Sequence, residues 1–480
     1  MSHDPGWLQE PFDYWGKSVT VMGLGRFGGG EGAARFLAWR GARVTVSDLK
    51  SESDLEEPVE RLSDCPNLAF KLGEHLERDF VDADLVVASP AVPRSNRLLE
   101  AARQADVPLT SEMNLFWLHN RGRVTGITGT NGKSTTTALI GEMLAADGRR
   151  PHVGGNIGRS LLPDVDEIES DDDVVLELSS FQLEDLNRIG VSPGVAVVTN
   201  FAANHLDRHT SLDEYREAKQ TILRWQQPGD VAILNADDSD VAGWTTRGRR
   251  LLFGGQFSSE LSAFVDGACI VCELDGDRID VASVNLHQLP GRHNRMNAAA
   301  AILAARALGV GRSAIVEGLR RFRSLPHRLN FIEEVAGRRF YDDSKATTPE
   351  AAMAAISAFD ADQPILLLAG GSDKGVDLSP FAAAIARRVK AAALMGETAS
   401  TLEHSIRESS RGNEPELSRS ADFAAAFAWV VERSAPGDVI LLSPGCASFG
   451  WFGSYEERGL AFESLVEEWS KRQGSRGGSA

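Results

Sequence analysis

The chain has 480 residues, which is too long for one hydrophobic core, so we expect about three domains. A formal net charge of −18, with no run rich in Lys and Arg, argues against binding along a nucleic-acid backbone. No stretch is apolar enough to span a membrane, the first 15 residues do not resemble a signal peptide, and four cysteines are too few for a disulfide framework. We therefore expect a cytoplasmic protein, and we take it to be a monomer.

The first strand–turn–helix unit of the sequence contains a Gly-x-Gly-x-x-Gly turn. Residues 18–22 are strand-like, the turn and a helix follow, and a second strand ends at an acid about 20 residues beyond the glycines. This pattern is typical of a dinucleotide site, although the same turn also holds other nucleotide phosphates or serves packing alone. We expect the domain to span residues 1–111. The candidate binding residues are Gly23, Leu24, Gly25, Arg26 and Asp48.

A second strand–loop–helix unit, at residues 123–147, has the composition of a phosphate-binding loop. A short apolar strand leads into Gly-Thr-Asn-Gly-Lys-Ser-Thr, and an amphipathic helix follows. Backbone N–H groups and the helix N-terminus attract an anion, the lysine neutralises it, and the serine can ligate Mg²⁺. The alternative is an ordinary glycine-rich turn that opens a helix. The residues of the loop are Gly129, Thr130, Asn131, Gly132, Lys133, Ser134 and Thr135.

Two polar residues of the central region stand at positions where burial is expected. Glu177 lies within an apolar run that predicts a buried strand, so it needs a cation, for which Mg²⁺ is suitable, unless it faces solvent at the strand end. Lys219 falls on the apolar stripe of a helix that Ser211 caps. It either extends its amine to the rim of that stripe or lies in a partly dry site, where the amine loses its proton easily.

Other candidate residues follow in loops. His205 lies in a stretch rich in His and Asp that suggests a metal or phosphate site. Asn156 belongs to a Gly-Gly-Asn-Ile-Gly cluster, which spacing alone does not distinguish from a plain loop. Asn294 and Asn297, one helical turn apart, could bond a nucleobase or cap their helix. We place the central domain at residues 112–324.

Strands alternate with helices in the last segment, residues 325–480, which predicts another doubly wound parallel sheet. Ligands of such sheets bind beyond the carboxyl ends of the strands. Residues 473–480 are expected to be a disordered tail. The candidate site residues in loops past the strands are Lys345, Thr347, Lys374 and Ser448.

Taken together, these motifs resemble those of the Mur ligases. The phosphate loop, Gly-Gly-Asn-Ile-Gly, Glu-Leu-Ser-Ser-Phe-Gln-Leu-Glu, Gly-Arg-His-Asn-Arg-Met-Asn and Pro-His-Arg all occur in the family's order. The resemblance implies an α/β fold of three domains: a Rossmann-like UDP-binding domain, a central domain like those of P-loop ATPases, and a Rossmann-like C-terminal domain. Asp-Ser-Lys-Ala-Thr and Leu-Leu-Ser-Pro-Gly-Cys-Ala-Ser narrow the implied reaction to the addition of D-glutamate to UDP-N-acetylmuramoyl-L-alanine, with ATP, in peptidoglycan synthesis.

The resemblance also implies a role for each candidate. Lys133 and Ser134 would hold the ATP phosphates and one Mg²⁺ with Glu177, while His205 and a carbamylated Lys219 would hold a second. The remaining matches are to ATP contacts at Asn294, Asn297, Arg328 and Asp343, to acceptor contacts at Asn156 and Ser179, and to glutamate contacts at Lys345, Thr347, Lys374, Ser448 and Tyr455.

Three alternatives stay open from the sequence. A related ligase of the family could add L-glutamate or another amino acid. A nicotinamide-dependent dehydrogenase could be built on the first glycine turn, but it would leave the phosphate loop and Lys219 unexplained. A nucleotide-binding module without activity is the third.

Overall fold

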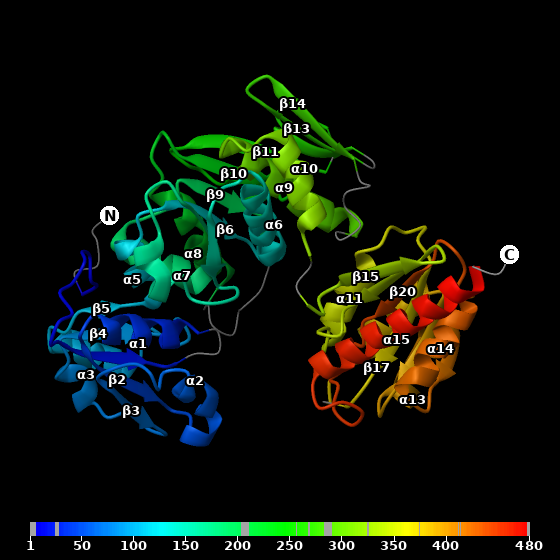
Figure 1. Ribbon diagram of the computed structural model, residues 1–480, viewed down its shortest axis with the longest axis horizontal. Coiled ribbons are helices and arrows are strands. Elements are labelled where there is room, and N and C mark those ends of the chain that lie inside the picture. Colours follow the sequence, from blue (N-terminus) through cyan, green and yellow to red (C-terminus); the bar gives the residue numbers. More distant parts are fainter. Residues whose placement is uncertain are drawn as a thin grey trace. The chain divides into compact units, whose positions relative to one another are not determined.

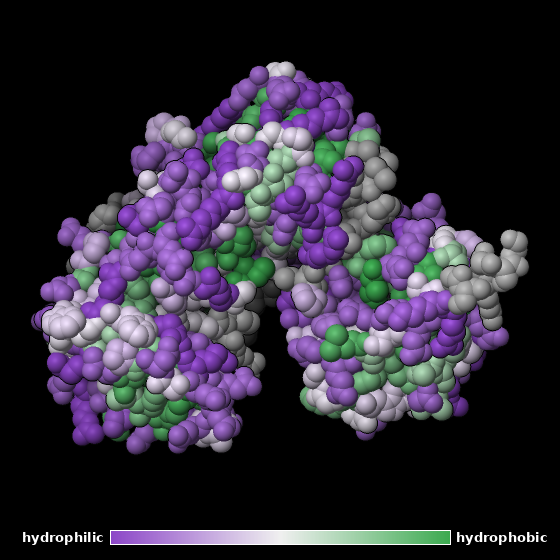
Figure 2. All heavy atoms as spheres, in the orientation of Figure 1, coloured by the Kyte–Doolittle hydropathy of each residue, from purple (hydrophilic) through white to green (hydrophobic). Residues whose placement is uncertain are grey.

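The computed structural model of the chain describes residues 6–24, 28–202, 211–255, 257–266, 269–282, 290–323, 326–373, 375–410, 412 and 414–477. Its residues form two compact units, one of residues 1–281 with 296–320 and one of residues 282–295 with 321–480. The described chain contains three β-sheets, and helices pack against each of them (Figure 1). The face drawn in Figure 2 is mostly hydrophilic, in keeping with the charge of the sequence. Among the described helices, none has the length and apolar character required to cross a bilayer.

The first sheet is parallel, with the strand order β3-β2-β1-β4-β5. Alternate strand residues point to opposite faces, so Val19 and Val21 pack beneath α1 while Met22 packs toward α4. The elements are β1 (Ser18–Met22), α1 (Gly29–Trp39), β2 (Arg43–Asp48), the 3₁₀ turn η1 (Glu52–Asp54), α2 (Glu56–Glu60), β3 (Leu68–Leu72), α3 (Arg78–Val81), β4 (Leu85–Ala88), α4 (Arg97–Gln104) and β5 (Leu109–Thr110).

The central sheet has the order β14-β13-β12-β11-β10-β9-β6-β8-β7, with β6 to β11 parallel and an antiparallel β12–β13 pair. Its elements are α5 (Glu112–His119), β6 (Arg123–Thr128), α6 (Lys133–Ala146), β7 (Pro151–Gly155), η2 (Leu162–Glu167), β8 (Asp173–Glu177), α7 (Ser180–Ile189), β9 (Val195–Val198), α8 (Leu212–Arg224), β10 (Val231–Asn235), η3 (Val241–Gly243), β11 (Arg249–Gly254), β12 (Ala263–Asp266), β13 (Cys269–Leu274), β14 (Asp277–Ala282), α9 (Gly291–Ala307) and α10 (Arg312–Arg321).

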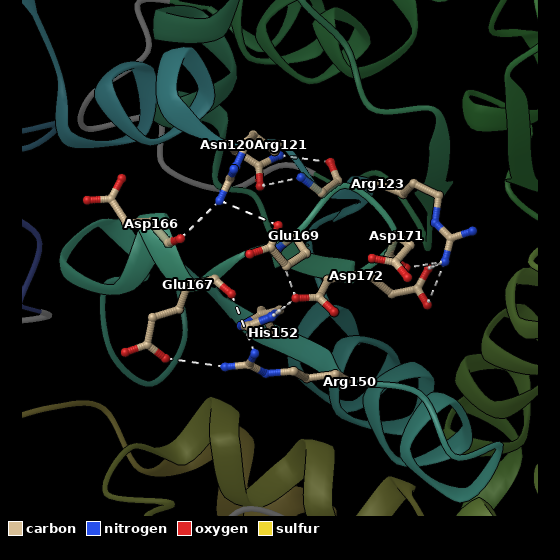
Figure 3. A network of polar contacts seen from close by, with 12 residues as sticks. Asn120, Arg121, Arg123, Arg150, His152, Asp166, Glu167, Glu169, Asp171 and Asp172 are labelled. Atoms are coloured by element: carbon tan, nitrogen blue, oxygen red, sulfur yellow. Dashed lines mark hydrogen bonds and ion pairs between the residues drawn. The ribbon is translucent and has the colours of Figure 1, made fainter.

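A polar network joins the amino ends of β6, β7 and β8, at the sheet edge opposite the glycine loop (Figure 3). His152 Nε2 lies 2.9 Å from Asp172 Oδ2, and Arg150 bonds Glu167 at 3.2 Å. Arg123 donates to the backbone oxygen of Asp171 at 2.7 Å. These contacts are local and mutually satisfied, so we assign the network to stability of the strand ends.

The first two sheets share one core. Side chains of α1, α5 and η2 pack together, and a single apolar cluster runs from the first sheet to the α7 and α8 side of the central sheet. This continuity explains why residues 1–281 form one unit although they contain two sheets. The boundaries at residues 111 and 324 stay predictions.

The third sheet has the order β15-β16-β20-β17-β18-β19. Helices α11 to α13 pack on one face and α14 and α15 on the other. The elements are β15 (Asn330–Val335), β16 (Arg338–Asp342), α11 (Pro349–Ser357), β17 (Ile365–Gly370), α12 (Ser379–Arg388), β18 (Ala391–Met395), α13 (Ala399–Ser409), β19 (Glu416–Arg419), α14 (Phe423–Arg433), β20 (Val439–Leu442) and α15 (Tyr455–Gly477).

Two expectations for the last segment were wrong in part. The sheet is not fully parallel, because β15 pairs antiparallel with β16 across the short turn at Ala336 and Gly337. The tail does not begin at residue 473, because α15 continues to Gly477. Lys471 and Arg472 form ion pairs with the glutamates four residues earlier, which supports the helix near its end.

A buried ion pair gives the fold its first testable prediction. Arg94 donates to both carboxylate oxygens of Asp185 at 2.6 and 2.5 Å, and the Asp185 side chain is fully buried. Arg94→Met removes the cation that is hydrogen-bonded to this buried carboxylate, although the charge of Arg188 still acts on it, so we expect a loss of about 3–5 kcal/mol and a clear fall in Tm by calorimetry. Arg97→Met is the control, because Arg97 pairs with Glu77 in solvent. Equal melting of the two variants would contradict the assignment.

Candidate active site

The phosphate loop has the geometry that the sequence predicts. Strand β6 ends at Thr128 and α6 begins at Lys133, and Gly132 takes a left-handed conformation with φ of 84°. A Cβ atom on Gly132 would lie 2.2 Å from Asn297 Oδ1, so only glycine fits there. The amine of Lys133 lies over the loop and donates to the backbone oxygens of Gly129 and Thr130 at 3.0 and 2.9 Å. Its charge is therefore held at the loop, beside the N-terminus of α6.

Three motifs that are far apart in the sequence meet at Glu177. This residue ends β8 and is 3% exposed. Its Oε2 accepts a hydrogen bond from the Ser134 hydroxyl at 2.6 Å, and its Oε1 accepts one from Asn156 Nδ2 at 3.0 Å. The carboxylate and hydroxyl oxygens are hard donors of the kind that Mg²⁺ prefers, so the residues present fit such an ion.

Lys219 is buried behind the loop, which decides between its two interpretations. The residue is 2% exposed, and Nζ donates to Gly129 O at 2.8 Å while lying 4.8 Å from the ring centre of Tyr215. Burial, with help from the nearby charge of Lys133, lowers the pKa of the Lys219 amine to about 7, although Glu177 opposes the shift. The amine does not reach the rim of the helix, and near neutral pH a large share of it is uncharged.

A second loop forms a wall of the site. Asn200 lies just past β9 and makes two hydrogen bonds with the backbone of Asn131. Its Oδ1 accepts one from the N–H group at 2.9 Å, and its Nδ2 donates one to the carbonyl oxygen at 2.9 Å. Thr130 N–H donates to Asn200 O at 2.9 Å. The sequence analysis missed Asn200, although a polar residue at the carboxyl end of the strand next to β6 was a usable signal. The predicted His205 lies outside the described residues.

The two asparagines of α9 have different surroundings. Asn297 is 7% exposed and packs against Gly132, so it lies at the phosphate loop. Asn294 donates to the backbone oxygen of Pro290 at 2.9 Å, a bond within its own helical turn.

The residues that the sequence assigns to the acceptor lie in two separate places. In the first sheet, Asp48 accepts from the backbone N–H of Leu24 at 3.0 Å and thereby fixes the turn at Gly23; Gly25 and Arg26 lie outside the described residues. Ser179 caps α7, and its hydroxyl is engaged with Gln182. A histidine that sequence reasoning missed, His75, lies 2.6 Å from the buried Ser47 hydroxyl next to Asp48. Its signal was its place just past β3.

The third sheet gathers several of its candidates at the carboxyl ends of β16 and β20. Lys345 Nζ lies 5.2 Å from the ring centre of Tyr455. Burial and the nearby charge of Arg328 lower the pKa of the Lys345 amine. Asp343 accepts from Ser443 Oγ at 2.7 Å, and burial raises the pKa of its carboxyl to about 7.

Two other candidates, Thr347 and Ser448, lie in loops that follow β16 and β20. Thr347 donates its backbone N–H to Lys345 O at 2.8 Å, and Ser448 is 5% exposed just past β20. Lys374 lies outside the described residues.

Comparison with known protein families accounts for all three sheets. Residues 17–111 match the N-terminal domain of MurD-like Mur ligases, residues 127–305 match the Mur ligase middle domain, and residues 327–446 match the Mur ligase glutamate ligase domain. The chain belongs to the Mur ligase family. The glycine turn of the first sheet is thus part of a Mur ligase N-terminal domain, which removes the reason to interpret it as a dehydrogenase site.

Among Mur ligases, curated relatives are similar over almost their whole length. The chain is 41% identical over 439 residues to the UDP-N-acetylmuramoylalanine–D-glutamate ligase of Symbiobacterium thermophilum, covering 90% of this chain and 94% of the relative. It is 40% identical over 468 residues to the ligase of the same name from Roseiflexus sp., covering 95% and 99%.

Solved structures show the same fold. The UDP-N-acetylmuramate–alanine ligase MurC of Thermotoga maritima superposes with a TM-score of 0.55 at 20% identity, covering 94% of this chain and 99% of MurC. A UDP-N-acetylmuramoyl-L-alanyl-D-glutamate–2,6-diaminopimelate ligase superposes with a TM-score of 0.57 at 18% identity, covering 96% and 95%.

The pKa of Lys219 predicts a pH-dependent stability. The amine loses its proton near pH 7 in the folded chain but only near 10.5 in the unfolded chain, so between these values the unfolded chain binds more protons and the free energy of unfolding rises with pH. Lys219→Met lacks this slope. In CO₂-free buffer, the Tm of wild type relative to Lys219→Met should rise from about pH 7 to pH 9.5 and stay level below about pH 6. A level difference across the whole range would mean that Lys219 stays charged.

Proposed function

We propose that the chain is an ATP-dependent amide ligase that joins D-glutamate to UDP-N-acetylmuramoyl-L-alanine in peptidoglycan synthesis. ATP phosphorylates the alanyl carboxylate, which gives an acyl phosphate and ADP. The amine of D-glutamate attacks the acyl carbon, and the tetrahedral intermediate expels phosphate as the amide forms. We place the reaction in the cytoplasm, as is usual for a chain whose four cysteines are all free thiols.

The observation that carries the proposal is the set of contacts around the phosphate loop. Lys133, Ser134, Glu177, Asn156 and the buried Lys219 come from four segments and surround one loop that ends a strand and begins a helix. This arrangement supports phosphoryl transfer, in which the protein mainly positions the reactants and neutralises charge. The names of the relatives that cover this chain nearly end to end support the choice of substrates.

The side chains around the phosphate loop are proposed to bind ATP and its metal ions. Lys133 and the N–H groups of the loop hold the β- and γ-phosphates, and Ser134 and Glu177 hold Mg²⁺. When bound, Mg²⁺ supplies charge neutralisation at the phosphate oxygens. His205 and Lys219 are proposed to hold a second Mg²⁺. The residues proposed to contact ATP elsewhere are Asn294, Asn297, Arg328 and Asp343.

The remaining candidates divide between the other two substrates. The first sheet is proposed to bind the uridine diphosphate of the acceptor at the Gly23 turn and Asp48, with Asn156 and Ser179 on its muramoyl side. Glutamate carries two carboxylates, which suit the cationic Lys345 and Lys374. The other proposed glutamate contacts are Thr347, Ser448 and Tyr455. These assignments correspond to domains at residues 1–111, 112–324 and 325–480.

An assay of phosphate release tests the proposal. The chain is supplied with ATP and Mg²⁺, one of several UDP-muramoyl acceptors, and one amino acid at a time. We expect release to require both substrates, and to be fastest with UDP-N-acetylmuramoyl-L-alanine and D-glutamate. Faster release with L-glutamate or a diamino acid would favour a related ligase of the family. No release with any pair would refute a ligase.

We further propose that Lys219 is carbamylated in the active enzyme. A positively charged amine would repel a metal ion at the site, whereas a neutral amine adds CO₂, forms an N–C bond and releases a proton. The product is a carboxylate-like anion, which suits Mg²⁺. The low pKa that burial gives this amine makes the neutral form available near pH 7.

The carbamate predicts an unusual pattern of rescue. Lys219→Ala should lose nearly all activity, because the anion is missing, and a small carboxylate such as formate or acetate should restore part of kcat by filling the vacated space. Lys219→Arg keeps its charge, so it should stay inactive with or without the additive. Phosphate release is the measurement. Most of the wild-type rate in Lys219→Arg would rule out the carbamate.

A further inference from the structure

A turn of unusual conformation carries Arg328. His327 has φ of 59° and Leu329 has φ of 45°, which places two residues with side chains in the left-handed region. This region is disfavoured for residues other than glycine, so a pair of them persists only where the surroundings hold the turn. The described contacts of this turn therefore show what fixes Arg328.

Three hydrogen bonds attach the turn to the last residue of β16 and to the loop that follows it. Lys345 N–H donates to His327 O at 3.0 Å, and Leu329 N–H donates to Asp343 Oδ1 at 3.0 Å. The third joins side chains: His327 Nδ1 lies 2.5 Å from Asp342 Oδ2. The backbone on both sides of Arg328 is thus tied to the segment that carries Asp343 and Lys345.

The His327–Asp342 pair is deeply buried. His327 is 7% exposed and Asp342 is fully buried, and burial raises the pKa of the Asp342 carboxyl although the bond to His327 opposes this. The second oxygen of Asp342 accepts from Ser344 N–H at 2.8 Å. A buried carboxylate is a poor source of stability, so the presence of Asp342 here is better explained by the geometry that it fixes.

Helix α15 closes over the pair with a glycine. A Cβ atom on Gly459 would lie 2.1 Å from His327 Nδ1 and 2.8 Å from Asp342 Oδ2, so the helix backbone contacts the pair directly. The preceding residue, Arg458, is also buried and donates to Ser344 Oγ at 3.0 Å and Ser344 O at 2.8 Å. The imidazole therefore has no room to move away from Asp342 toward α15.

A metal ion is the other occupant that these side chains suggest. Ligand atoms of His327, Asp342 and Glu463 lie within 4.8 Å of one another. Two ligands of one tetrahedral ion, each about 2.1 Å from it, lie about 3.4 Å apart. The 2.5 Å between His327 and Asp342 is instead the distance of a hydrogen bond, and the α15 backbone at Gly459 lies against both atoms. The geometry favours the hydrogen-bonded pair.

We propose that His327 is a positioning residue: the pair with Asp342, closed by Gly459, holds the left-handed turn so that Arg328 stands beside Asp343 and Lys345. Arg328 is exposed, and its charge acts on both neighbours. The inference rests on the proposed function, in which these three residues contact ATP and glutamate. It adds that their placement depends on a buried pair that contacts neither substrate.

Two variants disrupt the pair and two controls keep it. Asp342→Ala removes the partner of His327, and Gly459→Ala places a methyl group against the imidazole. Asp342→Asn keeps an oxygen for Ser344 N–H and an amide N–H for His327 Nδ1. Leu460→Ala changes the next residue of α15, which is 57% exposed.

We expect Asp342→Ala and Gly459→Ala to raise KM for ATP and for D-glutamate by about tenfold or more, while KM for the UDP-muramoyl acceptor stays within about twofold. Asp342→Asn and Leu460→Ala should behave as wild type. A purely structural role would lower Tm and raise no KM selectively, which would overturn the proposal. If Asp342→Ala does not fold, His327→Gln serves in its place.

Two further results separate the alternatives. Wild-type turnover is measured first: its absence refutes the proposed function, whereas normal wild-type turnover with unaltered variants refutes only the role of the pair. Calorimetric titration of the full chain with Zn²⁺ tests the metal. Tight binding of Zn²⁺ to wild type that is lost in Glu463→Gln would show a metal site and overturn the hydrogen-bonded pair. Equal Zn²⁺ titrations of wild type and Glu463→Gln would support the pair.

Discussion

The candidate active site depends on the burial of one amine behind the phosphate loop. Lys219 lies on the apolar face of α8, and its amine donates a hydrogen bond to Gly129 O at 2.8 Å. The residue is 2% exposed, so it is shielded from solvent. Burial makes the charged amine costly and leaves its pKa about 7. The loop is thereby supported from beneath by a group that can be neutral, while the amine of Lys133 lies over the same loop.

Much of the central site could be predicted because local sequence determines it. The strand, glycine loop and helix at residues 123–147 need only short-range pattern and backbone geometry, and the structure agrees with them almost residue for residue. The helical spacing also put Lys219 on an apolar face. It could not tell whether the amine reached solvent, since that depends on α8 packing beneath a loop 90 residues earlier in the chain.

Other features were beyond sequence reasoning because they are tertiary. Asn200 and Asp342 act through partners that only the packing of strands and of α15 supplies. The antiparallel β15 follows from a turn at residues 336–337 that joins strands too closely for a crossover helix. Ser179 was expected at the acceptor, and its hydroxyl is seen to cap α7. Short polar side chains suit caps and ligands equally well, so type and spacing do not distinguish these roles.

The central claim is that the chain activates a carboxylate by phosphorylation before it forms the amide. Isotope transfer tests this most directly. The acceptor is prepared with ¹⁸O in its alanyl carboxylate and is turned over with ATP and D-glutamate, and the released phosphate is examined by mass spectrometry. The acyl-phosphate route leaves the bridging carboxylate oxygen on phosphorus, so the account predicts phosphate carrying one ¹⁸O atom. Unlabelled phosphate released together with the amide product would contradict it.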